Sequence, residues 1–147
     1  MALDVTAETR IARRTEEVRA YVVDPMNDTQ WIGGISDSRL LTTGPLGVGS
    51  RVARVASFIG KRIEYVNEVT SLTDEELAMR SVEGPFPMEI TYRFAEDGDS
   101  TRVGVRVRGD AGGFYRVADP LMARQVRRSI EGDVERLRTI LESASVS

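Results

Sequence analysis

Three charged residues within apolar runs of the chain are the first candidates for chemistry. Arg54 shares a strand face with Phe58, and Glu68 shares one with Val66. Arg80 lies in a strand whose inward face the sequence leaves open. Because a buried charge needs a partner, an inward arginine and glutamate would form an ion pair that orients a ligand carbonyl or carboxylate. The alternative is a structural ion pair or a charge that faces solvent.

Tyrosine hydroxyls form the second group of candidates. Tyr65, Tyr92 and Tyr115 could each donate a hydrogen bond or act as an acid. The sequence contains no histidine and no cysteine, which excludes the commonest general base at neutral pH, thiolate nucleophiles and thiolate metal sites. Only carboxylate oxygens remain for a hard cation. We therefore expect no metal site and no cofactor, and the catalytic residues stay unknown.

Aromatic and thioether side chains on apolar faces are candidates for the lining of a ligand pocket, because flat rings and flexible methionines suit an irregular apolar ligand. The alternative is that they fill a closed core, and the pattern alone favours neither. With the three charged residues, the predicted ligand-binding set is Trp31, Arg54, Phe58, Glu68, Met79, Arg80, Phe86, Met88, Tyr92, Phe114 and Met122.

The elements that must position these residues follow from periodicity. Residues 3–11 alternate between apolar and polar, which predicts a half-buried strand. Two short helices are expected over residues 15–24 and 25–31, the second with proline at its first position. A run of antiparallel strands follows between residues 35 and 110, separated by turns at 44–49, 60–61, 73–75, 84–85 and 97–99.

The end of the chain predicts one long amphipathic helix from about residue 116 to 143. Its apolar residues recur every three or four positions: Met122, Val126, Ile130, Val134, Leu137 and Leu141. The charged residues between them predict a solvated helix surface, with an anionic partner as the alternative: Arg124, Arg127, Arg128, Glu131, Asp133, Glu135, Arg136 and Arg138.

This order of elements indicates one domain over residues 1–147, of the α+β class. The predicted fold is a helix-grip fold, a curved seven-stranded antiparallel sheet that wraps the C-terminal helix, with two short helices after the first strand. The helix has one apolar stripe and the sheet one apolar face, so each must cover the other. A single helix cannot fill a strongly curved sheet, and a cavity is expected between them. Phe86, Met88, Ile90, Tyr92 and Phe94 should share the concave face.

Several short stretches resemble the polyketide cyclase/dehydratase-like family of the superfamily that includes START lipid-transfer domains and the birch pollen allergen. They occur in that family's order along nearly the whole chain: Val22-Val23-Asp24-Pro25, Trp31, Gly44 to Gly49, Glu68-Val69-Thr70, Gly84-Pro85-Phe86, Gly98 to Val103, and Asp119-Pro120-Leu121-Met122 leading to Leu137 and Leu141-Glu142. The resemblance implies the helix-grip fold and a ligand pocket. Its enzymes close rings without metal or cofactor, but they share no catalytic motif, so no catalytic residue is transferred.

Three functions remain open from the sequence. The first is binding of a small apolar, lipid-like or polyketide-like molecule in the cavity. The second is a cofactor-independent cyclase or dehydratase in the same pocket, and the third is an interaction module with a vestigial cavity. Which of them applies, the identity of the ligand and the oligomeric state are left open.

Several features exclude other classes of function and location. The formal net charge of −3 argues against nonspecific nucleic-acid binding. No stretch resembles a secretory leader or a membrane span, so a cytoplasmic location is expected. Gly44 to Gly49 lacks the spacing of a dinucleotide loop and is interpreted as a hairpin turn. Asn27-Asp28-Thr29 matches a glycosylation sequon, which we interpret as a chance triplet in a capping turn.

Overall fold

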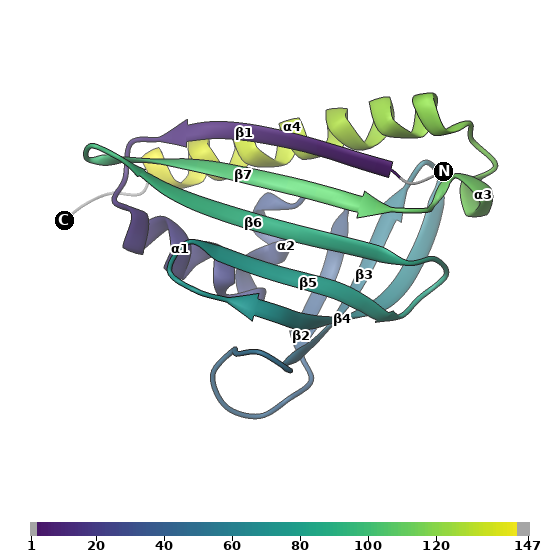
Figure 1. Ribbon diagram of the computed structural model, residues 1–147, viewed down its shortest axis with the longest axis horizontal. Coiled ribbons are helices and arrows are strands. Elements are labelled where there is room, and N and C mark those ends of the chain that lie inside the picture. Colours follow the sequence, from purple (N-terminus) through teal and green to yellow (C-terminus); the bar gives the residue numbers. More distant parts are fainter. Residues whose placement is uncertain (1–2, 144–147) are drawn as a thin grey trace.

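Alternation of apolar and polar side chains produces seven strands, which are joined by short connections and flanked by helices (Figure 1). The computed structural model describes residues 3–143. The elements in chain order are β1 (Leu3–Ile11), α1 (Thr15–Val23), the 3-10 turn η1 (Pro25–Asn27), α2 (Asp28–Trp31), β2 (Ile35–Leu40), β3 (Arg51–Phe58), β4 (Lys61–Leu72), β5 (Glu76–Glu83), β6 (Met88–Asp97), β7 (Ser100–Gly109), α3 (Gly112–Tyr115) and α4 (Asp119–Ser143). The predicted order of elements is confirmed, except that the short helix α3 was not predicted.

The seven strands form one antiparallel sheet in the order β1-β7-β6-β5-β4-β3-β2. From β2 to β7 each strand pairs with the next in the chain, and β1 closes the far edge against β7, with Leu3 opposite Gly109. A two-residue turn joins β3 to β4, and both of its residues have positive φ, 48° at Ile59 and 75° at Gly60. This turn matches the twist of antiparallel strands, although a β-branched residue such as Ile59 rarely adopts that conformation.

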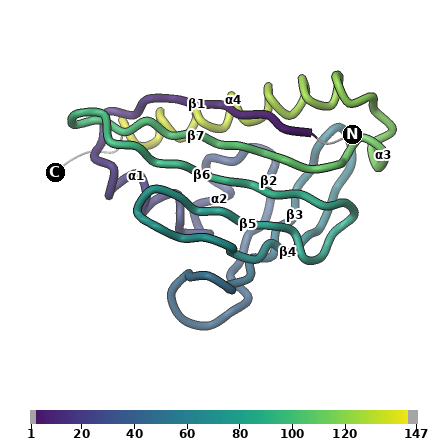
Figure 2. The backbone as a smooth tube through the Cα atoms, viewed as in Figure 1, coloured from purple at the N-terminus to yellow at the C-terminus, as the bar shows by residue number. Residues whose placement is uncertain are grey.

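The sheet is strongly curved, and α4 lies along its concave side next to β1 (Figure 2). The buried apolar residues of β1, β6 and β7 meet the stripe of α4 in one core, which also includes Val18 and Val22 of α1. A smaller cluster, formed by Ile35, Ala56, Ile63 and Tyr65, lies on β2, β3 and β4. These observations confirm the predicted α+β helix-grip architecture.

Two boundaries differ from the predictions. The long helix begins at Asp119 instead of near residue 116, because Arg116 adopts a left-handed conformation (φ 58°) that ends the short helix α3. Pro120 then occupies the first turn of α4, where its missing N–H costs nothing. The second difference concerns the glycine-rich turn, which was predicted at residues 44–49. In the structure it is part of a longer connection, residues 41–50, between the antiparallel strands β2 and β3.

Candidate functional site

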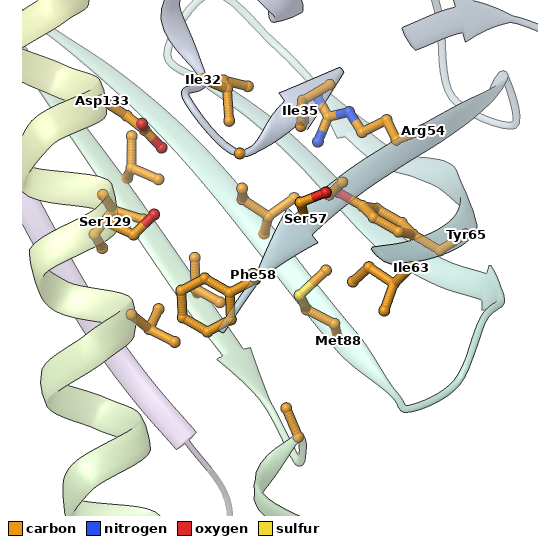
Figure 3. A pocket seen from close by; sticks show the side chains of 18 of the residues that line it. Ile32, Ile35, Arg54, Ser57, Phe58, Ile63, Tyr65, Met88, Ser129 and Asp133 are labelled. Atoms are coloured by element: carbon orange, nitrogen blue, oxygen red, sulfur yellow. The ribbon is translucent and has the colours of Figure 1, made fainter. Parts of the chain in front are cut away.

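A cavity of about 140 Å³ lies between α4 and the concave face of the sheet (Figure 3). A single water requires about 10–15 Å³ on this measure, so the space exceeds that of an isolated buried water. Most of the lining is apolar, and side chains of six strands and of α4 contribute to it. The lining residues used below are Trp31, Arg54, Ser57, Phe58, Ile63, Tyr65, Phe86, Met88, Ile90, Tyr92, Tyr115, Met122, Val126, Ser129, Ile130 and Asp133.

The alternation of side chains along each strand determines which residues form the sheet side of the cavity. On β6, Met88, Ile90 and Tyr92 point inward and line the cavity, as the alternation predicted. Phe94 continues the same face but lies in the closed core beyond the cavity, only 2% exposed. Phe86 precedes the strand and also lines the cavity.

The structure divides the predicted ligand-binding residues into two groups. Those in the cavity lining are Trp31, Arg54, Phe58, Phe86, Met88, Tyr92 and Met122. Those outside it are Glu68, Met79, Arg80 and Phe114. Met79 is buried in the core, and Phe114 packs against Phe86 and Tyr115, with the Lys61 ammonium 4.5 Å from its ring centroid.

The expectation that Glu68 and Arg80 point into the pocket is wrong. Ile63, Tyr65, Asn67 and Val69 are the buried positions of β4, so Glu68 belongs to the outer face of the sheet. There its carboxylate forms ion pairs with Arg51 at 3.3 Å and with Arg80 at 3.4 Å. Both arginines are well exposed, and this cluster is a surface salt bridge that contributes little to stability.

Arg54 does form a buried ion pair, but its partner is Asp28 of α2. Arg54 Nε and Nη2 donate to Asp28 Oδ2 at 3.1 and 2.9 Å, and the Ser38 hydroxyl donates to the same oxygen at 2.7 Å. The arginine is 4% and the aspartate 2% exposed. Burial alone would lower the pKa of Arg54, but Tyr92 and Asp28 raise it well above its usual value. The guanidinium therefore stays charged beside its own counter-ion.

Hydroxyl groups surround this ion pair. Arg54 Nη2 lies 3.4 Å from the Tyr92 hydroxyl, and burial raises the pKa of both Tyr92 and Tyr65. Both are therefore neutral donors at neutral pH. Two further donors of the lining, Trp31 Nε1 and the Tyr115 hydroxyl, are buried without a hydrogen-bond partner within residues 3–143.

Asp133 supplies the main polar group of the helix wall. Its Oδ1 accepts from the backbone N–H of Gly33 at 2.9 Å and from Arg136 Nη1 at 3.2 Å. Burial raises the pKa of this carboxyl, while those two hydrogen bonds and the Arg136 charge lower it. Figure 3 shows the carboxylate and the Ser129 hydroxyl turned toward the cavity. The residue is 6% exposed, so assigning Asp133 to a solvated helix surface was wrong.

Glycine at position 33 permits this arrangement. A Cβ there would lie 3.0 Å from Arg136 Nη1, which also donates to the backbone oxygen of Trp31 at 2.7 Å. The turn after α2 can therefore approach α4 closely enough for its N–H to reach Asp133.

Asp28 and Asp133 are the charged site residues that the sequence analysis missed. Asp133 falls on the apolar stripe, three residues after Ile130 and four before Leu137, and this spacing is a signal that could have revealed its burial. Asp28 carries no comparable local signal. Its partner Arg54 lies 26 residues away on a strand, so the pairing depends on the tertiary fold.

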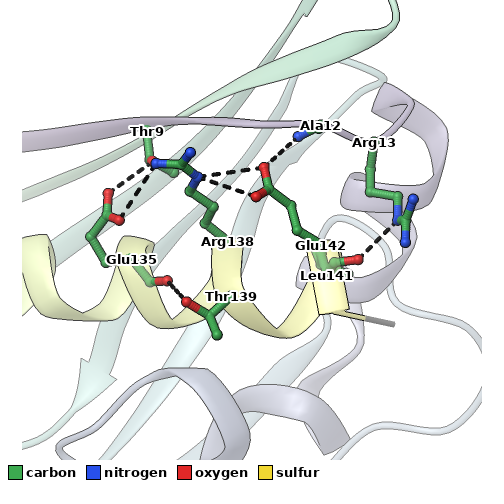
Figure 4. A network of polar contacts seen from close by, with 8 residues as sticks. All are labelled: Thr9, Ala12, Arg13, Glu135, Arg138, Thr139, Leu141 and Glu142. Carbon is green, nitrogen blue, oxygen red and sulfur yellow. Dashed lines mark hydrogen bonds and ion pairs between the residues drawn. The ribbon is translucent and has the colours of Figure 1, made fainter. Parts of the chain in front are cut away.

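The C-terminal half of α4 is held to β1 and the following residues by a polar network (Figure 4). The Thr9 hydroxyl donates to Glu135 Oε1 at 3.0 Å, and the backbone N–H of Ala12 donates to Glu142 Oε2 at 2.8 Å. Arg13 Nε donates to the carbonyl of Leu141 at 2.8 Å. This end of the helix is therefore fixed in place, away from the cavity.

The described part of the chain shows neither a candidate metal site nor a membrane-spanning helix. Within residues 3–143, no group of three or more acidic side chains is placed to hold a metal ion. No helix in that range is both long and apolar enough to cross a bilayer.

The fold and the cavity can now be compared with known proteins. Residues 2–142 match the family described as polyketide cyclase / dehydrase and lipid transport. The chain belongs to this family. The match spans every strand and α4 almost to its end, and it confirms the predicted family. No curated protein matches the sequence significantly.

Solved structures share the family's fold at low sequence identity. A START superfamily protein from Mycobacterium smegmatis aligns with a TM-score of 0.82 and 17% identity, over 97% of this chain and 99% of its own. A protein from Thermus thermophilus aligns with a TM-score of 0.81 and 23% identity, over the same shares of the two chains. The Zhui aromatase/cyclase from Streptomyces sp. R1128 gives 0.76 and 16%, over 99% and 100%.

Proposed function

We propose that the protein binds a small apolar compound in the cavity between α4 and the sheet. The observation that carries this proposal is a mostly apolar cavity of about 140 Å³ onto which a few polar groups converge. Such a combination is typical of small-molecule sites, where apolar walls supply affinity and sparse polar groups fix orientation. The family, which includes lipid transport by its description, is consistent with this role.

The cost of an empty apolar cavity supports the same proposal. Side chains that border a void lose dispersion contacts on one side, which destabilises the folded protein. The core next to the cavity is closed, with Leu137 and Val103 fully buried. The chain therefore fills one end of its interior and leaves the other open, a difference that ligand binding explains.

A cyclase or dehydratase activity is the second candidate, and one observation favours it. The sheet wall places neutral hydroxyls of Tyr65 and Tyr92 beside the Arg54 cation, while Asp133 lies on the helix wall. Aldol closure requires a base to remove a proton beside a carbonyl and donors to stabilise the enolate oxygen. Asp133 supplies a carboxylate for the first role, and the tyrosines supply donors for the second.

Binding is tested by titrating the purified protein with Nile red, a neutral dye whose fluorescence rises in apolar surroundings. We expect saturable binding at one site and displacement by apolar compounds. Met88→Trp should weaken binding because the indole fills the cavity, whereas Met26→Trp, at a position 71% exposed, should leave it unchanged. Absence of saturable binding would remove both the carrier and the enzyme proposals and leave the interaction module.

The enzyme proposal has a separate test. A synthetic poly-β-ketone is incubated with the protein, and ring closure is followed by absorbance of the aromatic product. We expect acceleration that Asp133→Asn abolishes while Nile red still binds. Binding without any acceleration would leave the carrier function alone.

A further inference from the structure

Both ionised side chains of the cavity wall already have counter-ions inside the protein. Of the described residues that line the cavity, only Arg54 and Asp133 carry a charge at neutral pH. Asp28 neutralises Arg54 at 2.9 Å, and Arg136 neutralises Asp133 at 3.2 Å. The two counter-ions come from α2 and α4, so each pair is complete before a ligand arrives.

This compensation determines which charge a ligand can carry. A carboxylate in the cavity would lose its hydration and meet a guanidinium that already has an anion. An ammonium would meet a carboxylate that already has a cation. A neutral molecule gives up much less hydration and leaves both ion pairs intact. The charges of the wall therefore favour an uncharged ligand, although arginine and aspartate are both present.

The unused hydrogen-bonding capacity differs between the two walls. On the helix wall, Asp133 Oδ1 accepts two hydrogen bonds, while Oδ2 receives none from residues 3–143. This oxygen can accept a hydrogen bond from a ligand. On the sheet wall, the Tyr65 side chain points toward α4 in Figure 3, and burial keeps its hydroxyl protonated. Hydroxyls of this kind can donate to an acceptor oxygen.

From these contacts we infer that the cavity selects a neutral compound with two polar ends and discriminates against carboxylates. A hydroxyl at one end donates to Asp133 on the helix wall. A carbonyl oxygen at the other end accepts from the hydroxyls of the sheet wall. The inference rests on the proposed binding function and specifies its ligand class as neutral hydroxy-carbonyl compounds, in contrast to fatty acids.

A matched set of naphthalenes tests this inference by displacement of Nile red at pH 7.5. The set contains 6-hydroxy-2-acetylnaphthalene, 2-acetylnaphthalene, which lacks the hydroxyl, and 6-hydroxy-2-naphthoate, which is an anion. We expect the hydroxy-ketone to bind about tenfold or more tightly than the naphthoate, because the anion loses hydration without gaining a free cation. The ketone without the hydroxyl should bind about fivefold or more weakly than the hydroxy-ketone.

Two variants test whether internal compensation is the cause. Asp28→Asn exposes the positive charge of Arg54 and should reverse the preference toward the naphthoate. Asp4→Asn is the matched control, because Asp4 pairs with Arg106 on the exposed outer face of the sheet. Arg136→Gln changes a side chain that is 45% exposed, against 2% for Asp28, so folding should be retained even if Asp28→Asn does not fold. It leaves Asp133 without its cation and should admit protonated 2-(aminomethyl)naphthalene, which the unmodified protein should exclude.

The outcomes separate this inference from the proposed function. If the naphthoate binds the unmodified protein as tightly as the hydroxy-ketone, the inference is overturned and the binding function stands. The same holds if Arg136→Gln gains no affinity for the amine. If neither Nile red nor any naphthalene binds saturably, the binding function fails and the inference fails with it.

Discussion

The two halves of α4 carry one continuous apolar stripe but face different surroundings. The C-terminal half buries Val134 and Leu137 in the closed core, and Glu135 and Glu142 accept hydrogen bonds from the β1 region. The N-terminal half turns Met122, Val126, Ser129 and Ile130 toward the cavity. α4 packs mainly against β1, and the cavity lies between its first half and side chains of β3 and β4 such as Phe58 and Tyr65.

This comparison indicates that the C-terminal end of α4 contributes mainly to stability, whereas its N-terminal end contributes mainly to ligand binding. The closed end supplies full apolar burial and a satisfied polar network. The open end retains apolar surface without contacts and buried donors without partners, such as Trp31 Nε1 and the Tyr115 hydroxyl. Regions with fewer contacts open at lower free-energy cost than the core does, which suits a site that must admit a ligand.

The largest expected effect is a loss of stability when an apolar side chain of α4 is shortened, and it should differ between the two ends of the helix. Leu137→Ala should lower the free energy of unfolding by about 2–5 kcal/mol, because it creates a cavity in a closed core. Ile130→Ala only enlarges an existing cavity and should cost less, about 1–2 kcal/mol. Urea unfolding measures both. Equal losses would contradict the division of α4 into two halves.

The next test enlarges side chains on one face of β6. Phe94→Trp adds volume to the closed core and should destabilise the protein by about 1–3 kcal/mol. Met88→Trp places similar bulk in the cavity and should cost less than about 1 kcal/mol. Thermal and urea unfolding compare the two, and a larger loss for Met88→Trp would indicate that the cavity is closed in solution.

A smaller effect is expected in the pH dependence of stability at Asp133. Burial raises the pKa of this carboxyl in the folded protein above its ordinary value of 3.8. Its stabilising contribution is therefore fully present below that value and is lost as the pH rises through the higher folded pKa. Asp133→Asn lacks this loss, so its free energy of unfolding relative to the unmodified protein should increase from acid toward neutral pH. Parallel urea-unfolding curves across that range would contradict the assignment.

The smallest expected effect concerns the network of Figure 4. Glu142→Gln keeps the shape of the side chain but weakens acceptance from the Ala12 N–H and from Arg138. Because the carboxylate is partly exposed, we expect a loss of about 0.5–1 kcal/mol. Nile red affinity should not change, and a fall in affinity would show that the two ends are coupled.

The fold could be predicted because it depends on local periodicity. The local order of apolar and polar residues determines the alternation in β1 and β6 and the apolar stripe of α4. The same order determines that Met88 and Tyr92 point inward. The parity of β4 could not be assigned in this way. Asn67 is buried while Val66 and Glu68 lie on the outer face, so apolar character misidentifies the inner face of that strand.

The polar site residues were harder to predict for a different reason. A buried ion pair at Arg54 was one of the alternatives that the sequence left open, but the carboxylate comes from Asp28 on another element. Which acid reaches an inward arginine depends on how α2 packs against the sheet, and no local spacing encodes that. Asp133 was misassigned because the surrounding arginines suggested a hydrated surface, although its position on the apolar stripe pointed inward.

The pairing of β1 with β7 has a consequence for how the chain reaches this structure. β1 is synthesised well before its strand partner, which ends at Gly109, and before the helix that covers it, which ends at Ser143. Hairpins such as β3–β4, closed by a two-residue turn, bring together neighbours in sequence and can form early. Joining β1 to β7 requires closure of a loop that spans most of the chain, and its entropic cost makes it a late step in folding. During synthesis, the apolar face of β1 remains uncovered until β7 and α4 have been made.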